Sequence, residues 1–408
     1  MNHLQQLIKK ISIKSSTKIL MVVLDGLGGV LSPETGKSEL ESASIPNLDA
    51  LARKSHCGLI IPVERGITPG SGPAHLSLFG YDPVEYDIGR GVLEALGIGF
   101  PLEKDDLACR ANFATWDGNV ITDRRAGRIP TEKNRKLCSL LQENITEIEN
   151  IQVIIRPGKG HRFVVIFRGR GLHANLTEND PQKEGHSPIA IKARDKESEF
   201  SGAIINKFIL KFLDVEKKNP EEFSPANYVL MRGFSHCPDI PSMEEIYKLN
   251  SAAIATYPMY RGLAQLVGMD ILSCKGESIE DEISTLKEQY DKFDFFYFHI
   301  KETDALGEDG NFKGKVQSLE KIDRYVPQLV DMKPDVLIIT GDHSTPSVLK
   351  SHSWHPVPIL IYSKFMPSHA VNGFSEKECL HGSLGIFHSS EIMSIAMANA
   401  LKLAKYGA

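Results

Sequence analysis

The sequence lacks long apolar runs, closely spaced cysteine pairs and an excess of positive charge. No window reaches the roughly 18 uninterrupted apolar residues of a membrane helix, so we expect no membrane segment. The six cysteines form no CxxC pair, which excludes a zinc ribbon and favours a reducing compartment. With 47 basic against 52 acidic residues and a net charge of -5, no nucleic-acid surface is expected. We therefore expect a cytoplasmic protein without membrane or nucleic-acid partners.

The signals of two other protein classes are also missing. The glycines of residues 88–99 do not follow the GxGxxG pattern, and this excludes a dinucleotide-binding fold. The N-terminal segment has no continuous apolar stretch followed by a cleavage site, so we expect no signal peptide. What remains is an ordinary balance of 41% hydrophobic and 24% charged residues over 408 positions, enough for two domains and a large core.

Four apolar runs have the character of strands that are buried on both faces of a parallel sheet. They are Ile19–Leu24, Asp294–Ile300, Asp335–Thr340 and Val357–Ile361. Between residues 106 and 251 the pattern changes to hairpins and amphipathic helices, with Asp117-Gly118 as a hairpin-turn signal. We therefore predict an α/β domain of residues 1–105 and 252–408, interrupted by an inserted α+β domain of residues 106–251.

The stretch from Thr68 to Asp82 places Ser71 between two glycines, just before an apolar segment that Pro73 can start as a helix. A hydroxyl at a helix N-terminus faces free backbone N–H groups and the positive end of the helix dipole. That environment suits a phosphate ester. The alternative is that Ser71 merely caps the helix, and the stretch alone does not decide between the two.

Residues of metal-binding type end, begin or lie beside the predicted strands. They are Asp25, Asp304 with Glu308, Asp342 with His343, and His352 with His355. Each alone is more often a cap or a surface residue, but parallel strands bring their carboxyl ends to one edge of a sheet. Mixed carboxylate and imidazole ligands suit Mn²⁺, Zn²⁺ or Mg²⁺. Two ions about 4 Å apart would clamp an in-line phosphoryl transfer, so the residues predict a two-metal enzyme that forms a phosphoserine.

The inserted segment is rich in arginine, and the run from Thr122 to Arg128 places three arginines beside Asp123. Like charges at this density favour bidentate binding of phosphate or carboxylate. A solvated basic loop is the alternative.

Several of these motifs occur in the order typical of a known family. They are Asp25-Gly26, the stretch from Thr68 to His75, Thr303-Asp304, Gly341 to Ser344, and His352 with Pro356 to Pro358. The chain resembles the alkaline phosphatase superfamily and, within it, the archaeal-type cofactor-independent phosphoglycerate mutases, over nearly its whole length. The resemblance implies an alkaline-phosphatase-like, mostly parallel sheet flanked by helices, with an inserted cap domain. It also implies interconversion of 3-phosphoglycerate and 2-phosphoglycerate through a phosphoserine.

The resemblance assigns roles to the metal-type residues. Ser71 would accept the phosphate and bind one metal ion, which Asp25, Asp342 and His343 would also hold. Asp304 and His352 would hold a second metal. The family usually has a histidine four residues after that aspartate, whereas this chain has Glu308, and His355 is a second candidate for the missing ligand. Two divalent ions are implied, with Mn²⁺ preferred and Zn²⁺, Mg²⁺ or Co²⁺ as alternatives.

In the inserted segment, the resemblance makes Asp123 an acid/base for the glycerate hydroxyls. Clamps on the phosphate and carboxylate of a small phosphorylated metabolite would be Arg124, Arg128, Arg162 and Arg261, with Lys301 assisting. Two other functions stay open. One is a phosphomonoesterase, or a mutase of another phosphorylated metabolite. The other is a non-catalytic binding protein, which the departure at Glu308 motivates.

Overall fold

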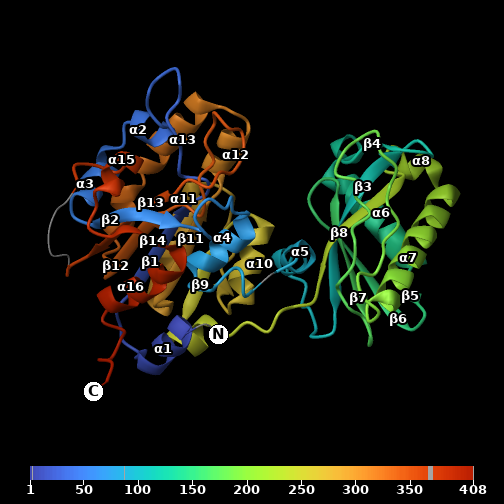
Figure 1. Cartoon of the computed structure of the whole chain (residues 1–408), viewed down its shortest axis with the longest axis horizontal. Coiled ribbons are helices and arrows are strands. Elements are labelled where there is room, and N and C mark those ends of the chain that lie inside the picture. The colour runs from blue at the N-terminus through green and yellow to red at the C-terminus, as the bar shows by residue number, and fades with distance from the viewer. Residues whose placement is uncertain (2, 87, 366–370, 408) are drawn as a thin grey trace. The chain divides into compact units, whose positions relative to one another are not determined.

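The computed structural model describes residues 1, 3–86, 88–365 and 371–407, and the chain folds into two compact units (Figure 1). The larger unit comprises residues 1–87 and 240–408, and the inserted unit residues 88–239. Each is described by itself below. In the described residues, no helix is long and apolar enough to cross a membrane.

The larger unit is built on an eight-stranded sheet of order β10-β9-β11-β1-β12-β13-β2-β14. Strand β1 lies between β11 and β12 and is parallel to both, whereas β13 is antiparallel to its neighbours β12 and β2. Every residue of β1, β11 and β12 is buried, as continuous apolar runs predict for strands covered on both faces. The strands are β1 (Ile19–Leu24), β2 (His56–Ile61), β9 (Ser251–Ile254), β10 (Asp270–Ile271), β11 (Phe295–Ile300), β12 (Val336–Thr340), β13 (Val357–Ser363) and β14 (Gly385–His388).

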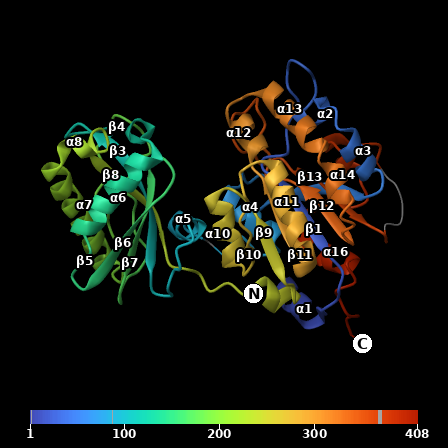
Figure 2. The same ribbon diagram turned by 180° about the vertical axis from the view of Figure 1, so that it is seen from behind.

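Helices cover both faces of this sheet, as the view from behind also shows (Figure 2). They are α1 (His3–Ile11), α2 (Glu39–Ser42), α3 (Pro46–Ala52), α4 (Ser71–Leu78), α9 (Met243–Tyr247), α10 (Pro258–Leu266), α11 (Ile279–Gln289), α12 (Glu302–Glu308), α13 (Phe312–Asp323), α14 (Val326–Val330), α15 (Glu376–Leu380) and α16 (Ile392–Asn399). The predicted fold class, an α/β protein with a mostly parallel sheet flanked by helices, is confirmed.

The inserted unit holds a six-stranded sheet of order β4-β3-β7-β6-β5, with β8 on the free side of β3. The predicted hairpin around Asp117-Gly118 is the antiparallel pair β3–β4. The strands are β3 (Leu107–Trp116), β4 (Ile121–Asp123), β5 (Glu147–Ile148), β6 (Ile151–Pro157), β7 (Arg162–Arg168) and β8 (Tyr228–Ser235). The helices are α5 (Arg90–Gly97), α6 (Thr131–Asn144), α7 (Glu199–Lys218) and α8 (Pro220–Phe223).

Side chains alternate between the two faces of β3, and the faces differ in character. Cys109, Ala111 and Phe113 join the apolar core with residues of α6 and α7. Helix α5 packs against β3 so closely that a Cβ on Gly91 would lie 2.4 Å from the Cα of Cys109. Arg110 lies on the face opposite the apolar core.

The sequence pattern predicts domain boundaries at 105/106 and 251/252, whereas the two compact units divide at 87/88 and 239/240. Residues 88–105 belong to the inserted unit because α5 packs on β3 and β8. Residues 240–251 belong to the larger unit because α9 packs on α1. The change in sequence pattern marked where the strands of the insertion begin, not where its first helix begins.

Candidate active site

Four chain segments bring polar side chains to one edge of the larger sheet. Asp25 directly follows β1, Asp304 lies in α12 after β11, and Asp342 follows β12. Because β1 is flanked by β11 and β12 in parallel, the carboxyl ends of these strands are neighbours. The segment with His352 precedes β13, and since β13 is antiparallel to β12, its start lies at the same edge.

Asp25, Asp342 and His343 form the first group whose ligand atoms could hold a metal ion. The Nε2 of His343 lies 3.1 Å from Oδ2 of Asp342 and 3.4 Å from Oδ1 of Asp25. All three side chains are fully buried. Gly26 permits this approach, because its φ is +67° and a Cβ there would lie 2.9 Å from the Cα of Asp304.

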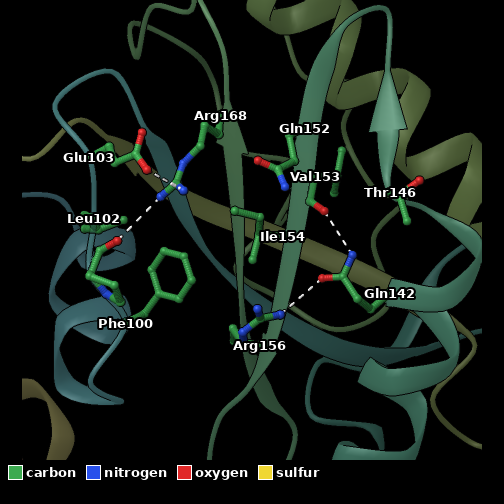
Figure 3. Close-up of a pocket in the computed structure, with 11 residues that line it drawn as sticks. Phe100, Leu102, Glu103, Gln142, Thr146, Gln152, Val153, Ile154, Arg156 and Arg168 are labelled. Atoms are coloured by element: carbon green, nitrogen blue, oxygen red, sulfur yellow. Dashed lines mark hydrogen bonds and ion pairs between the residues drawn. The ribbon is translucent and has the colours of Figure 1, made fainter.

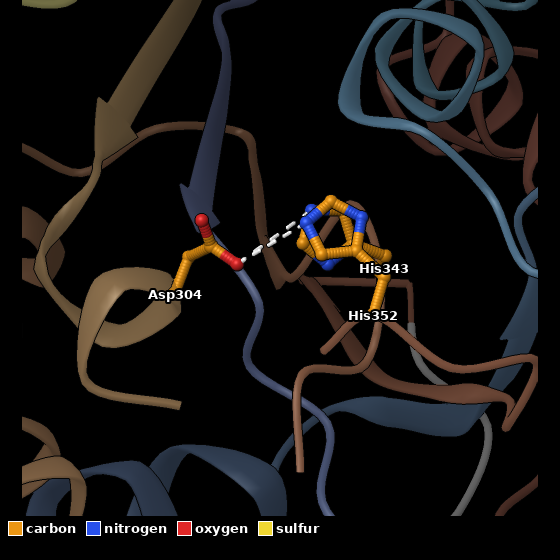
Figure 4. A group of neighbouring side chains, drawn as sticks. All are labelled: Asp304, His343 and His352. Atoms are coloured by element: carbon orange, nitrogen blue, oxygen red, sulfur yellow. Dashed lines mark ion pairs between the residues drawn. The ribbon is translucent and has the colours of Figure 1, made fainter. Parts of the chain in front are cut away.

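Asp304, His343 and His352 form the second group (Figure 4). The Nε2 of His352 lies 3.5 Å from Oδ1 of Asp304. The two imidazole rings are stacked, with centroids 3.6 Å apart. His343 therefore belongs to both groups, although its single Nε2 lone pair can bind only one ion.

The two candidates for a further ligand of the second group differ in the structure. The Oε1 of Glu308 lies 3.8 Å from Nε2 of His352, and the Glu308 side chain is 55% exposed. His355 instead directs Nδ1 to the hydroxyl of Ser353, at 3.0 Å, and stacks on Trp354. Glu308 is therefore the candidate that contacts a member of the second group.

Hydrogen bonds at the far side of each ring orient the two histidines. The Nδ1 of His352 lies 3.0 Å from the carbonyl of Pro69, to which it can only donate. The hydroxyl of Thr345 lies 2.9 Å from Nδ1 of His343 and donates to Oδ1 of Asp304 at 2.8 Å. Both rings thus carry hydrogen on Nδ1 and present the Nε2 lone pair to the carboxylates, the arrangement typical of metal-binding histidines.

Ser71 is the first residue of α4, and the helix is capped by Gly70 without a side-chain bond. Its hydroxyl lies 3.4 Å from Nε2 of His343, beside the first group. His75, one turn further along α4, places Nδ1 at 2.8 Å from the carbonyl of Ser71 and 3.3 Å from Oδ2 of Asp342. Burial lowers the pKa of His75 to about 3, so its ring is neutral. The structure does not support the alternative that Ser71 serves only as a helix cap.

Lys301, predicted from the resemblance to assist substrate binding, lies among the carboxylates. Its ammonium is 3.0 Å from Oδ2 of Asp25 and also contacts Asp304. Burial opposes the charge, but Asp25 and Asp304 outweigh it and raise the pKa of Lys301. The Tyr260 hydroxyl donates to the same Asp25 oxygen, and His299 lies 3.3 Å from it.

The charges of the first group fit a divalent cation. Oδ1 of Asp25 and Oδ2 of Asp342 are buried and have no hydrogen-bond partner. Burial and the nearby Asp25 and Asp304 raise the pKa of Asp342 well above its usual range. Buried carboxylates are otherwise paired or bound to metals, so a cation between these oxygens would satisfy both.

The predicted residues of the inserted unit have different surroundings. Asp123 accepts backbone N–H bonds from Arg125 and Gly127, both at 2.7 Å, and so shapes its own loop. Arg124 is paired with Asp180 through two bonds of 2.8 and 2.6 Å. Arg128 is exposed. Arg124 is thus held by a carboxylate of its own unit.

A basic cluster on the inserted sheet contains the predicted Arg162 together with Arg110 and Arg232, which had no predicted role. Arg110 on β3 stands directly opposite Arg232 on β8, and Arg162 on β7 is in register with the neighbouring Asn112. Burial, with the charges of Arg162, Arg232 and Arg90, lowers the pKa of Arg110 to about 10. The Nε atoms of Arg110 and Arg232 are buried without a hydrogen-bond partner. Only the strand register reveals this cluster, because its members are distant in the sequence.

A cavity of about 500 Å³ in the inserted unit lies near Phe100, Arg156 and Arg168 (Figure 3). Glu103 and Asp106 pair with Arg168 at 2.6 and 2.7 Å. No predicted site residue lines this cavity, and neither do Arg110 and Arg232.

A serine hydroxyl at a helix N-terminus, beside two groups that could hold metal ions at the edge of an α/β sheet, fits an enzyme of phosphoryl transfer. Comparison with known proteins gives the family. The model of the family "2,3-bisphosphoglycerate-independent phosphoglycerate mutase" matches residues 52–221. Proteins named probable mutases of this kind are 53% identical in Thermotoga neapolitana, over 99% of both chains, and 49% identical in Aquifex aeolicus, over 100% of both.

Solved structures agree with this result. A protein of Pyrococcus horikoshii is 30% identical, with a TM-score of 0.83, and the match covers 97% of this chain and 100% of that one. The cofactor-independent phosphoglycerate mutase of Thermoplasma acidophilum is 30% identical, with a TM-score of 0.72, over 94% and 100% of the two chains. The chain belongs to the 2,3-bisphosphoglycerate-independent phosphoglycerate mutases, as the resemblance of its motifs predicted.

Proposed function

We propose that this chain interconverts 3-phosphoglycerate and 2-phosphoglycerate by moving the phosphoryl group to Ser71 and back. The observation that carries the proposal is the position of the Ser71 hydroxyl, at the N-terminus of α4 and 3.4 Å from Nε2 of His343. In the first step the Oγ–P bond forms as the bond from phosphorus to the substrate oxygen breaks. In the second step the other hydroxyl of the retained glycerate attacks the phosphoserine, and Ser71 is regenerated.

We assign one divalent ion to Asp25, Asp342 and His343, with the Ser71 hydroxyl beside it. A second ion belongs to Asp304 and His352, with Glu308 as the further ligand. We propose Mn²⁺ for both, with Zn²⁺, Mg²⁺ and Co²⁺ as alternatives. Carboxylate and imidazole ligands without thiolates suit all four ions. Such ions, when bound, supply Lewis acidity that lowers the pKa of a coordinated hydroxyl and offsets negative charge on a phosphoryl group.

The chain's own residues supply the remaining functions. The free N–H groups at the start of α4 and the Lys301 ammonium offer positive charge to a phosphoryl group on Ser71. The Arg110–Arg232 pair, with Arg162, suits the phosphate or carboxylate of a small acid, because an anion would relieve the repulsion between like charges. Arg124, Arg128 and Arg261 remain predicted substrate residues. Asp123 remains a predicted acid/base, and its bonds to Arg125 and Gly127 favour a loop-shaping role beside it.

The experiment is ³¹P NMR of the purified protein with 3-phosphoglycerate and Mn²⁺, without added bisphosphoglycerate. The proposal expects a 2-phosphoglycerate signal that chelation and Ser71→Ala both remove. Inorganic phosphate appearing faster than the isomer would instead identify a phosphomonoesterase. Unchanged substrate in every metal tested would identify a non-catalytic binding protein.

We also propose the cytoplasm as the compartment. All six cysteines are free thiols, as expected in a reducing environment.

A further inference from the structure

Lys315 is a fully buried lysine on the inner stripe of α13. It lies four residues before Leu319 and seven before Ile322, positions that face the core with it. An amphipathic helix ordinarily carries an apolar residue at such a position, because burying an ammonium group is costly unless its hydrogen bonds are replaced. We therefore expect Lys315 to have a role other than core packing.

The ammonium of Lys315 donates three hydrogen bonds to main-chain carbonyls. The acceptors are Gly26 at 2.8 Å, Thr345 at 2.9 Å and Gly28 at 3.1 Å. An ammonium has three N–H donors, so its capacity is filled. All three acceptors lie in the two segments that carry the first candidate metal group.

The bonded segments reach the ligands directly. Gly26 follows Asp25, and its N–H donates to Oδ1 of Asp342 at 3.1 Å. Thr345 comes two residues after His343, and its hydroxyl bonds to both His343 and Asp304. A shift of the Thr345 carbonyl would therefore move the side chain that orients ligands of both groups.

Two carboxylates extend the same support. Glu376 accepts from the N–H of Gly29 at 2.8 Å, and the buried Glu39 accepts from the N–H of Ser347 at 2.7 Å. Gly29 and Ser347 continue the segments that Lys315 holds. The buried ammonium of Lys315, the buried Glu39 and the partly buried Glu376 thus all bind to the same two loops.

We infer that Lys315 is a positioning residue for both candidate metal groups, and that the affinity of the site for a divalent cation depends on it. The inference rests on the proposed function only in that the site binds metal, and it does not require mutase turnover. Residues that orient metal ligands typically change affinity about 10- to 100-fold when replaced.

Lys402 provides a matched control. It is also fully buried, donates to the carbonyl of Ser15 at 2.8 Å and lies 3.5 Å from Asp294. Asp294 precedes β11, so Lys402 lies toward the amino ends of the strands, opposite the edge that carries Asp304. Removing Lys402 takes the donor from the Ser15 carbonyl and the cation from Asp294, and removing Lys315 takes the ammonium from the carbonyls of Gly26 and Thr345. Of the two lysines, Lys315 is the one that holds the ligand loops.

The test is isothermal titration of metal-free full-length protein with Mn²⁺ for wild type, Lys315→Met and Lys402→Met. We expect Lys315→Met to weaken Mn²⁺ binding about 10- to 100-fold, and Lys402→Met to bind like wild type although both lower the melting temperature. If isomerase activity is present, raising Mn²⁺ should restore turnover in Lys315→Met. Wild-type affinity in Lys315→Met, or equal weakening in Lys402→Met, overturns the inference.

Lys315→Arg keeps the test decisive if Lys315→Met does not fold. A planar guanidinium keeps the charge but cannot direct its N–H groups to three carbonyls as an ammonium does. We expect weaker Mn²⁺ binding, and unchanged binding would contradict the inference. Wild type that binds Mn²⁺ without isomerising phosphoglycerate would refute the proposed function and leave this inference standing.

Discussion

The two units of the chain carry opposite kinds of charged site. In the larger unit, Asp25, Asp304 and Asp342 converge with two imidazoles at the edge of a buried parallel sheet. In the inserted unit, Arg110 and Arg232 face each other across an antiparallel pair of strands. The first arrangement concentrates negative charge and suits a cation, whereas the second concentrates positive charge and suits an anion. The two units therefore differ in the sign of the charge that their polar clusters carry.

The largest expected effect is on kcat, and it follows from replacing Ser71, the proposed nucleophile of the larger unit. Ser71→Ala should lower kcat by about 10⁴-fold or more, because no other hydroxyl replaces it as the phosphate acceptor. The readout is formation of 2-phosphoglycerate by ³¹P NMR. Mn²⁺ titration is the control, since the carboxylate and imidazole ligands remain and affinity should change little. Appreciable turnover in the variant would rule out a phosphoserine at this residue.

Arg110→Met and Arg232→Met should separate anion binding from cation binding. We expect KM for 3-phosphoglycerate to rise about 10- to 100-fold, since a charge-assisted bond to an anion is lost, while Mn²⁺ affinity stays unchanged. Steady-state kinetics and titration provide the two measurements. Arg194→Met, at an exposed position of the same unit, should behave like wild type. A normal KM in both variants would mean that the cluster does not hold the substrate.

Glu308 and His355 can be compared within the second metal group. Glu308→Ala should weaken the second Mn²⁺ site about tenfold, because a carboxylate near His352 is lost. His355→Ala should leave both sites intact, since the ring nitrogens of His355 fall in neither candidate metal group. Metal analysis after dialysis against limiting Mn²⁺ measures the stoichiometry. The reverse pattern would transfer the ligand role to His355.

The smallest expected effect is on the free energy of unfolding of the inserted unit when Asp180 is replaced. Burial raises the pKa of Asp180, but the bond and charge of Arg124, together with the N–H bond of Gln182, outweigh burial and lower this pKa below its usual value. The folded state therefore favours the carboxylate, and the stabilisation is present above the unfolded pKa of about 3.9 and lost as pH falls below it. Asp180→Asn should cost about 1–2 kcal/mol at pH 7 and less near pH 3. Urea unfolding at both pH values tests this, and equal costs would contradict it.

The sequence predicted the sheet and the convergence of metal-type residues for physical reasons that the structure bears out. Continuous apolar runs marked β1, β11, β12 and β13, and parallel strands placed the residues after them at one edge. The apolar pattern of residues 391–405 would allow a longer closing helix, but α16 ends at Asn399. Helix ends depend on packing and capping more than on apolar periodicity.

Residues whose role depends on tertiary pairing could not be predicted. Lys315 and Tyr260 lie on helices where the pattern indicates only a buried face, and their partners are far away in the sequence. The Arg110–Arg232 pair exists only through the register of β3 and β8. The bond between Arg124 and Asp180 was equally hidden, because 56 residues separate them.

The reversed direction of β13 has a consequence for how this site can vary. Asp25 and Asp342 are fixed by strands that run toward the edge, so changing them disturbs the strands that deliver them. His352 instead arrives on a connection that returns to the edge before β13 begins. Length and composition of that connection can change while the first metal group stays in place. The segment that supplies His352 can therefore vary more freely than the strands that supply Asp25 and Asp342, in evolution or by design.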